Sequence, residues 1–503
     1  MFSLLFMAPL LSMSTASAAS FRYAEDQAPG IVNPLFSTTM GEARVNELLF
    51  DGLYSDNQEL ATVPELVQSD ELSEDGLTLT LRLRSDVSWH DGRPLQGQDV
   101  AFTVQAMKEP GTLSTEAGRV SFIERVETQG DSLVILHFTE PQVRPQDKLT
   151  FKILPSHAFS SSVVSRSDSF RTRPLGTGPY KLVSYNDDNS ITFQANSESL
   201  GGAARIAEVV MREVSDKSYQ AKLLLYESLE GLVRVLPRDL AVLQNNRKIE
   251  LYPYQTNSWW YVGFNQARAP FDDARVRQAL SYLVDVDALL APVGTGELLS
   301  GPFVRSSPFY NHQVSPRTYN DTRAATLLEE AGFAREGGMW TRDGEPLTVT
   351  LSAHRTLESA QEVVINLQSQ LRSGGVTVEV EFLDEAEWKA RIWRQQDYDL
   401  VLSQWSFDRN EDIREQLHSD GARNFGSYSN PEVDGLLDEA RSTRDPQVKK
   451  AALRKVHALA SQDSPMIFLW TLDSYSAIST RVDDVVIHPF YFFTWVRQWH
   501  MGS

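Results

Sequence analysis

The spacing of hydrophobic residues changes along the chain, and the change divides it into two regions of different architecture. In the first half, residues 77–83 (LTLTLRL) alternate leucine with polar residues, a period of two that is typical of a half-buried β-strand. Similar segments predict further strands at 132–138, 181–185, 190–195 and 259–265. Residues 44–54 have helical spacing instead, so this half is mixed and rich in strands.

After residue 265, strands and helices alternate. The pattern predicts one long amphipathic helix over 276–290, and a helix over 359–371 between strands at 347–351 and 376–382. A β–α–β succession implies a parallel sheet with crossover helices, so we expect an α/β fold. Further elements are predicted as helices at 323–331, 432–441 and 449–460 and as strands at 399–402 and 466–469.

The N-terminus carries the features of an export signal. Residues 4–11 (LLFMAPLL) form an apolar run, and Ala16-Ser17-Ala18-Ala19 follows as a cleavage pattern, although no Lys or Arg precedes the run. We expect residues 1–19 to be a signal peptide; the alternative is a buried N-terminal helix. No later stretch of 18 apolar residues follows, so the mature chain is not expected to be inserted in the membrane.

The composition of the chain excludes several classes of function. The chain has 503 residues and a net charge of −20, which argues against nucleic acid and anionic membranes as partners. At roughly 150 residues per domain, the length suggests about three domain-sized units. The absence of cysteine excludes disulfides, thiolate chemistry and a lipoprotein anchor, but it does not by itself indicate a compartment. The periplasmic location that we expect follows from the signal peptide.

The sequence contains no recognisable catalytic motif. His90 beside Asp91 is a possible base with its orienting carboxylate, but the pair lies in a turn pattern, WHDG. Gly176-Thr177-Gly178 resembles a phosphate-binding loop only superficially, because Pro179 removes a backbone donor. The nine histidines do not occur at metal-ligand spacing. We therefore predict no enzyme, no metal site and no cofactor.

Seven segments, in order along the chain, together resemble one family, the extracellular solute-binding proteins of family 5. That family includes the dipeptide, oligopeptide and nickel binders of bacterial ABC importers. The segments are 77–102, with WHDGRPL at its centre, 154–157 (LPSH), 176–180 (GTGPY), 264–285 (FNQARAPFDDARVRQALSYLVD), 324–333 (AATLLEEAGF), 429–440 (SNPEVDGLLDEA) and 463–465 (DSP). The same motifs have physical roles in a scaffold. Asp99 and either Asp272 or Asp273 suit helix N-caps, which leaves Arg275 and Arg277 as structural residues.

The resemblance implies a two-lobed periplasmic-binding-protein fold of the class II type, with an extra subdomain in the N-terminal lobe. The large lobe would combine 20–265 with 473–503 and contain the subdomain at about 61–172, and the second lobe would be 266–472. Such a protein is expected to be a monomer that holds a small ligand between its lobes and delivers it to the permease subunits of an ABC transporter.

The resemblance also suggests which residues bind a peptide. Burying the charged ends of a peptide without partners costs several kcal/mol each, so the site should supply an acid and a base. The family's W-x-x-D segment corresponds to Trp405–Asp408, whose aspartate would pair with the ligand's ammonium group. Arg355 follows the strand before a long helix, where dipeptide binders pair an arginine with the ligand's carboxylate. The alternative for each is an ordinary surface charge in a loop.

Other contacts are expected from aromatic and hydroxyl side chains. Trp405 and either Trp259 or Trp260 would wall the site, with core packing as the alternative, and Ser37, Thr38 and Thr39 would offer hydroxyl and backbone groups.

Two segments depart from the family pattern, so ligands other than a peptide remain possible. Residues 409–414 (RNEDIR) lack the usual proline, and 227–233 (ESLEGLV) stands where a G-x-x-D segment is usual. A nickel chelate, an opine-like compound, a sugar or a modified peptide therefore remains as an alternative ligand. A ligand-presenting sensory module and an enzyme on a derived fold remain as alternative functions.

Overall fold

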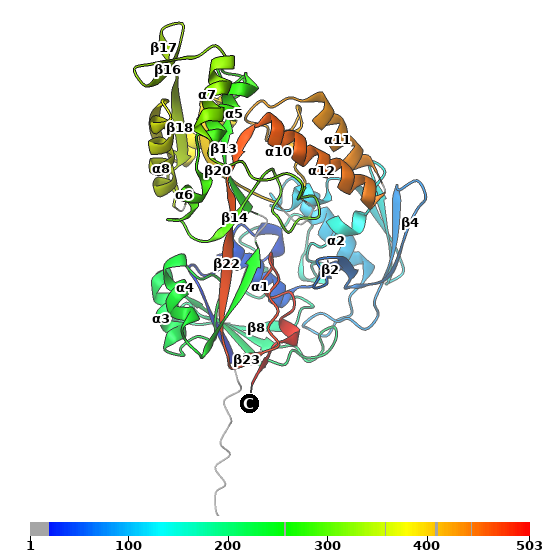
Figure 1. The fold of residues 1–503 in the computed structure, drawn as a ribbon. Coiled ribbons are helices and arrows are strands. Elements are labelled where there is room, and N and C mark those ends of the chain that lie inside the picture. Colours follow the sequence, from blue (N-terminus) through cyan, green and yellow to red (C-terminus); the bar gives the residue numbers. More distant parts are fainter. Residues whose placement is uncertain (1–19, 256–257, 358, 408–410, 444, 503) are drawn as a thin grey trace, which may run out of the picture. The chain divides into compact units, whose positions relative to one another are not determined.

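The protein is described by a computed structural model covering residues 20–255, 258–357, 359–407, 411–443 and 445–502. The chain forms two compact units (Figure 1). Unit 1 contains residues up to 141, 148–252 and from 476 onward, and unit 2 contains 142–147 and 253–475. The expected signal peptide, residues 1–19, lies outside the described residues.

Unit 1 is built on a mixed sheet whose strands come from both ends of the chain. The sheet has the order β12-β22-β11-β1-β10-β9-β8, and β1 (Ser20–Glu25) runs parallel to both of its neighbours. Phe21 and Tyr23 of β1 are fully buried, as suits a strand at the centre of a sheet. The other elements are β8 (Tyr180–Tyr185), β9 (Ile191–Ala195), β10 (Glu208–Glu213), β11 (Gly231–Leu232), β12 (Ile249–Gln255), β22 (Trp470–Ser479), α1 (Met40–Leu49), α3 (Lys217–Leu225) and α4 (Pro237–Gln244).

A second, antiparallel sheet in unit 1 has the order β4-β5-β7-β6. In β5 (Thr78–Leu83), Leu79, Leu81 and Leu83 are buried while the residues between them are not, which confirms the strand predicted from alternation. Helix α2 (Gly97–Lys108) packs on this sheet. The remaining strands are β4 (Val67–Leu72), β6 (Ile123–Gln129) and β7 (Leu133–Phe138), all within the range 61–172 that the sequence suggests for a subdomain.

Apart from the short segment 142–147, the chain changes unit at two places, within the strands β12 and β22. The first of these two boundaries, at 252/253, lies before the expected position at 265. The reason is that β13 (Ser258–Phe264) pairs with β20 and β21, which belong to unit 2. The second boundary, at 475/476, lies close to the expected one at 472/473.

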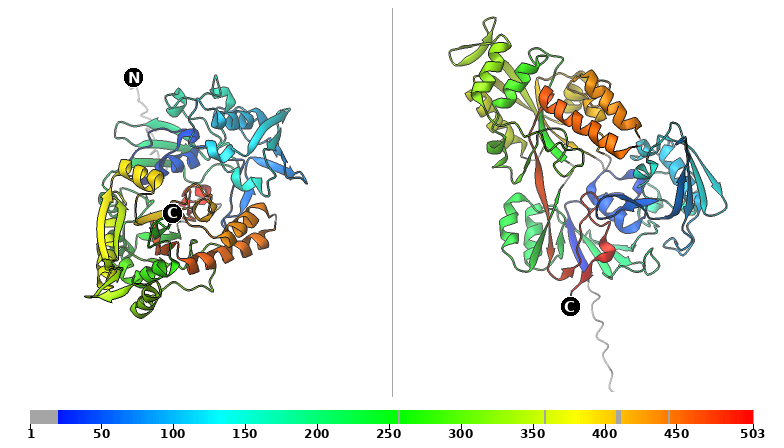
Figure 2. Two further views of the ribbon diagram at one scale, coloured as in Figure 1. Left: turned by 90° about the horizontal axis from the view of Figure 1, so that it is seen from above. Right: turned by 45° about the vertical axis from the view of Figure 1, so that its right-hand side comes forward.

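Unit 2 contains a mixed sheet, in which β19, β18 and β20 are the parallel strands predicted from the β–α–β pattern and β13 is antiparallel to its neighbours β20 and β21. Its order is β19-β18-β20-β13-β21, and β18 (Thr348–His354) runs parallel to both β19 (Thr377–Leu383) and β20 (Leu400–Ser406). Helix α8 (Ala360–Ser373) connects β18 to β19, and α11 (Pro431–Ser442) and α12 (Pro446–Asp463) pack side by side (Figures 1 and 2). Other elements here are β21 (Met466–Phe468), β14 (Gly296–Leu298), α7 (Asp321–Glu330), α9 (Glu385–Trp388) and α10 (Arg414–Leu417).

The long helix predicted over 276–290 is wrong, because the segment forms two helices. α5 (Ala274–Tyr282) ends and α6 (Val286–Leu290) begins around Asp285, whose side chain accepts a hydrogen bond from the backbone of α6. The side-chain amide of Gln370 on α8 bonds both the N–H and the C=O of Asp285. The oxygen of Gln370 thus takes the place of the helical carbonyl that a continuous helix would offer to the N–H of Asp285, while the C=O of Asp285 also accepts from Leu289 N in α6. The predicted N-cap Asp273 is confirmed.

Asp99 does not cap a helix that begins at the next residue, as its sequence context suggested. Helix α2 begins at Gly97, its N-cap is Gln96, and Asp99 lies in the first turn, 2% exposed. Its carboxylate accepts hydrogen bonds from Trp89 Nε1, from Gln96 N and from the backbone and hydroxyl of Ser156. Asp99 therefore holds together the WHDG turn, helix α2 and the LPSH segment.

The GTGPY turn has glycines because it passes very close to the end of α1. Gly178 N donates to the carbonyl of Leu49 over 2.9 Å. A Cβ atom on Gly176 would lie 1.7 Å from that carbonyl oxygen, and one on Gly178 would lie 2.5 Å from the carbonyl carbon. Only glycine fits such a close approach of two backbones.

His90 fastens the same turn and is not placed as a catalytic base. Its Nδ1 accepts a hydrogen bond from Gly176 N, and its Nε2 lies 3.2 Å from the carbonyl oxygen of Gly178. Asp91 is paired elsewhere, with His157. Burial lowers the pKa of His90 to about 4, so the ring stays neutral at physiological pH.

Within the described ranges, no helix combines the length and the apolar character needed to cross a bilayer.

Candidate functional site

Arg355 lies at the carboxyl edge of the sheet in unit 2. It follows β18 directly, its backbone N donates to the carbonyl of Leu383, and its Nη2 donates to the carbonyl of Phe382 over 3.2 Å. The side chain is exposed, and its other guanidinium nitrogens have no partner among the described residues. The neighbouring strand thus orients the guanidinium group and leaves donors available to a ligand.

Trp405 lies at the same edge as Arg355. Its strand, β20, is parallel to β18 with Ala353 opposite Leu402, and Trp405 lies beyond that pair. The ring is partly exposed, and the guanidinium of Arg423 lies 5.7 Å from its centroid. Its indole N–H is buried and has no hydrogen-bond partner in the described part of the chain. The structure therefore brings two of the expected site residues to one edge of a sheet.

Trp260 and Trp259 are core residues on opposite faces of β13. Trp260 is 3% exposed and stacks on Trp470 with ring centroids 6.0 Å apart. Trp259 is fully buried on the other face, directly across from Trp405 in the antiparallel β13–β20 pair. Of these two, Trp259 is the one beside Trp405.

Thr38 and Thr39 are exposed residues in unit 1 that take part in the cap of α1. Thr39 is the N-cap, and its hydroxyl accepts from Glu42 N, while the Glu42 carboxylate accepts from the backbone N–H groups of both threonines. The Thr38 hydroxyl also donates to Glu42. Among the residues that the structure describes, the Thr39 hydroxyl proton has no acceptor, so it can still donate to a ligand.

Asp408, the expected partner of a ligand ammonium group, lies outside the described residues. In the part of the chain that is described, no group of three or more His, Asp or Glu side chains is arranged to hold a metal ion.

Sequence reasoning missed a pocket in unit 1 that is lined by both apolar and charged side chains, Ser37 among them. Its volume is about 100 Å³, and its walls include Ser37, Asn46, Glu47, Lys152 and Tyr491. Glu47 and Lys152 form an ion pair of 2.7 Å with side chains 8% and 15% exposed. The signal in the sequence was the pair of acids Glu47 and Asp51 within the otherwise largely apolar stretch 45–54.

Further charged side chains, buried or half-buried, lie near this ion pair. Arg497 Nη2 donates to Asp51, and Glu65 accepts from the backbone N–H of Gly52. Burial and the nearby charge of Asp51 raise the pKa of Glu65 to about 7. Burial disfavours the charged form of Lys152, but Glu47, Glu65 and Asp51 outweigh it, so its pKa is raised.

The raised pKa of Glu65 predicts how stability depends on pH. Between its usual pKa of 4.5 and about 7, the folded protein holds a proton that the unfolded chain releases, so the free energy of unfolding falls as pH rises. Glu65→Gln should remove this fall and stabilise the protein at pH 8 by up to about 3 kcal/mol. Urea unfolding at pH 5 and pH 8 measures the difference. Exposed Glu59→Gln is the control, and an equal pH dependence in wild type and Glu65→Gln would contradict the assignment.

Comparison with known proteins shows which family the chain is similar to. The sequence model described as bacterial extracellular solute-binding proteins, family 5, middle matches residues 61–422. Protein XP55 of Streptomyces lividans is 27% identical over 449 residues, covering 87% of this chain and 81% of XP55. The oligopeptide-binding protein AppA of Bacillus subtilis is 23% identical over 482 residues, covering 92% of this chain and 88% of AppA.

Solved structures share the fold over nearly the whole chain. AppA of Bacillus subtilis in complex with a nonapeptide has a TM-score of 0.77 at 21% identity, covering 96% of this chain and 99% of that one. NikZ of Campylobacter jejuni in complex with Ni(L-His) has a TM-score of 0.77 at 25% identity, with the same coverage. The family match spans most of the chain, and the α/β fold is that of these binding proteins. The chain therefore belongs to family 5 of the bacterial extracellular solute-binding proteins.

Proposed function

We propose that this protein is the exported, monomeric ligand-binding component of an ABC importer and that its ligand is a short peptide. Asp408 pairs with the peptide's ammonium group, Arg355 pairs with its carboxylate, and Trp405 packs against the backbone between them. The threonines at the start of α1 supply contacts from unit 1. The mature chain then hands the peptide to the permease subunits in the membrane.

The observation that carries the proposal is the position of Arg355 beside Trp405 at one edge of the sheet. Ligands of open parallel sheets bind at the carboxyl ends of the strands. The carbonyl of Phe382 orients the guanidinium group while other donors stay available, which suits a bidentate carboxylate. In sequence, Asp408 comes three residues after Trp405 and two after Ser406, the last residue of β20.

The relatives support a peptide first and a metal chelate second. AppA is named for oligopeptide binding and has been solved with a nonapeptide. NikZ, at 25% identity, has been solved with Ni(L-His), a metal chelate of an amino acid. A peptide accounts for Asp408 and Arg355 together without requiring metal ligands from the protein.

One hydrogen bond between a serine and a histidine resembles a catalytic pair, but its surroundings do not suit catalysis. Ser300 Oγ lies 2.9 Å from His457 Nε2, a serine–histidine pair, and also 2.8 Å from the hydroxyl of Tyr310. Ser300 is 3% exposed and His457 is fully buried. Burial lowers the pKa of His457 to about 3, so this histidine is a poor base, and its enclosed serine has no access to a substrate.

Isothermal titration calorimetry with dialanine, trialanine and pentaalanine, each free, N-acetylated and C-amidated, tests both charge pairs. Asp408→Ala should weaken binding of the free peptides at least a hundredfold, because a buried pair is worth about 3–5 kcal/mol. N-acetylation should weaken wild-type binding similarly and should cost Asp408→Ala little more. Arg355→Met should behave in the same way toward C-amidated peptides.

The control variant is Glu336→Ala, which removes an exposed acid from β15 (Ala334–Glu336) of the same unit. It should leave affinity unchanged. If Asp408→Ala and Arg355→Met bind free peptides as tightly as the control does, the pairing scheme is wrong. Binding of Ni(L-His) in place of all the peptides would favour the chelate.

A further inference from the structure

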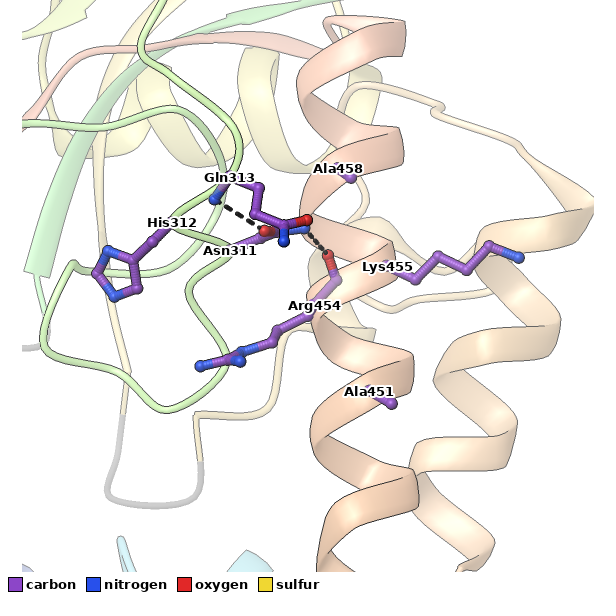
Figure 3. Close-up of a pocket in the computed structure, with 7 residues that line it drawn as sticks. All are labelled: Asn311, His312, Gln313, Ala451, Arg454, Lys455 and Ala458. Carbon is purple, nitrogen blue, oxygen red and sulfur yellow. Dashed lines mark hydrogen bonds between the residues drawn. The ribbon is translucent and has the colours of Figure 1, made fainter.

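A second hollow, of about 380 Å³, lies in unit 2 between α12 and the loop that contains residues 311–313 (Figure 3). It is separate from the edge that carries Arg355 and Trp405 and is built from other elements. Its walls are formed by Asn311, His312, Gln313, Ala451, Arg454, Lys455 and Ala458.

The residues that line this hollow carry a net positive charge, whereas the protein as a whole carries a net negative charge. The sequence has 67 acidic residues and a net charge of −20, yet none of the seven lining residues is acidic. Two of them, Arg454 and Lys455, are cations, and His312 adds an imidazole. A concave surface lined in this way attracts anions locally.

Of the two cations that line the hollow, Arg454 is the one available to a ligand. Its Nε donates to the carbonyl of Pro308 over 3.0 Å, which fixes the guanidinium plane, and its Nη groups have no partner among the described residues. Figure 3 shows Arg454 and His312 on the same side of α12, whereas Lys455 points to the other side. Lys455 is paired there with Glu432 at 2.6 Å.

The loop is fastened to the helix before any ligand arrives. Asn311 Nδ2 donates to the carbonyl of Arg454 over 3.2 Å, and Asn311 Oδ1 accepts from Gln313 N (Figure 3). The ring of Tyr310, in the same loop, contacts the rings of His312 and His457, with centroids 4.9 and 4.5 Å apart. The hollow is therefore preorganised, which reduces the entropic cost of binding.

We propose that this hollow binds a small multivalent oxyanion, held bidentately by Arg454 and by the imidazole of His312. A phosphate and a polycarboxylate share the required chemistry, because both present two oxygens to the guanidinium fork. The site is independent of the peptide pairing at Asp408 and Arg355.

Calorimetric titration with phosphate and with citrate, at ionic strength held constant with sodium chloride, tests this site. At least one anion should give a single saturable site, and Arg454→Gln should weaken it at least tenfold. Arg454→Lys, which keeps the charge but loses the fork, should fall in between, and His312→Gln should weaken it severalfold. Which of the two anions binds identifies the source of the oxyanion.

Two controls separate this site from general charge effects and from the peptide site. Lys455→Gln, the adjacent cation that points away, should change affinity less than twofold, and Arg355→Met should also leave it unchanged. The proposal is overturned if neither anion binds saturably. It is equally overturned if Lys455→Gln weakens binding as much as Arg454→Gln, or if Arg355→Met abolishes it.

Discussion

Gly176→Ala is expected to destabilise unit 1 by about 4 kcal/mol or more, enough to prevent stable folding of many proteins. The new methyl group would lie 1.7 Å from the carbonyl oxygen of Leu49, which is a backbone atom, and the methyl carbon is itself fixed directly to the backbone of residue 176. Neither segment can move freely. Hydrogen bonds join Gly178 to Leu49 and Thr177 to Asp51, and Gly176 itself is hydrogen-bonded to His90. Overpacking of this kind cannot be relieved by a side-chain rotation.

Differential scanning calorimetry or urea unfolding measures the effect, and Gly118→Ala is the matched control. Gly118 is an exposed glycine of the same unit, in a 3-10 turn, and a Cβ atom there would meet nothing within 4 Å. The control should change stability by less than about 0.5 kcal/mol. Equal stability of the two variants would show that the turn does not approach α1 as closely as described.

Arg277→Met is expected to cost about 3–5 kcal/mol, the second large effect. Arg277 is 4% exposed in α5, and its guanidinium donates to four carbonyls, those of Phe271, Asp272, Asp463 and Ser464. It thus joins the start of α5 to the end of α12. Burial lowers its pKa, but an arginine stays charged, so removing it leaves four acceptors without their donors.

Arg275→Met is the control for Arg277. Arg275 is exposed on the same helix and pairs with Asp273 at 2.6 Å. A surface ion pair of this kind is worth about 0–1 kcal/mol, so urea unfolding should separate the two variants clearly. A loss as small for Arg277→Met as for Arg275→Met would contradict the structural role of the buried residue.

The elements that sequence patterns predicted well are those specified by local burial. Alternation in 77–83 predicts β5 because every second leucine faces the core, and the β–α–β pattern predicts the parallel pairing of β18 and β19. The break between α5 and α6 could not be predicted in this way. It depends on the amide of Gln370, which is 85 residues from Asp285 in sequence.

The site could be predicted only in part, for the same reason. The resemblance placed Arg355 and Trp405 near each other, and the register of β18 with β20 brings both to one edge. It offered no choice between Trp259 and Trp260, since neighbouring strand residues point to opposite faces and both are buried. The ion pair of Glu47 with Lys152 joins residues far apart in sequence and has no local pattern.

Native mass spectrometry of the mature protein, purified without denaturation from cells grown on peptide-rich medium, tests the central claim most directly. A buried peptide with both ends paired should dissociate slowly and remain bound through purification. We expect a mass increment equal to a short peptide, which is released on denaturation and is absent from the Asp408→Ala variant. A retained metal chelate or sugar, or no retained ligand together with no calorimetric response to any peptide, would contradict peptide binding.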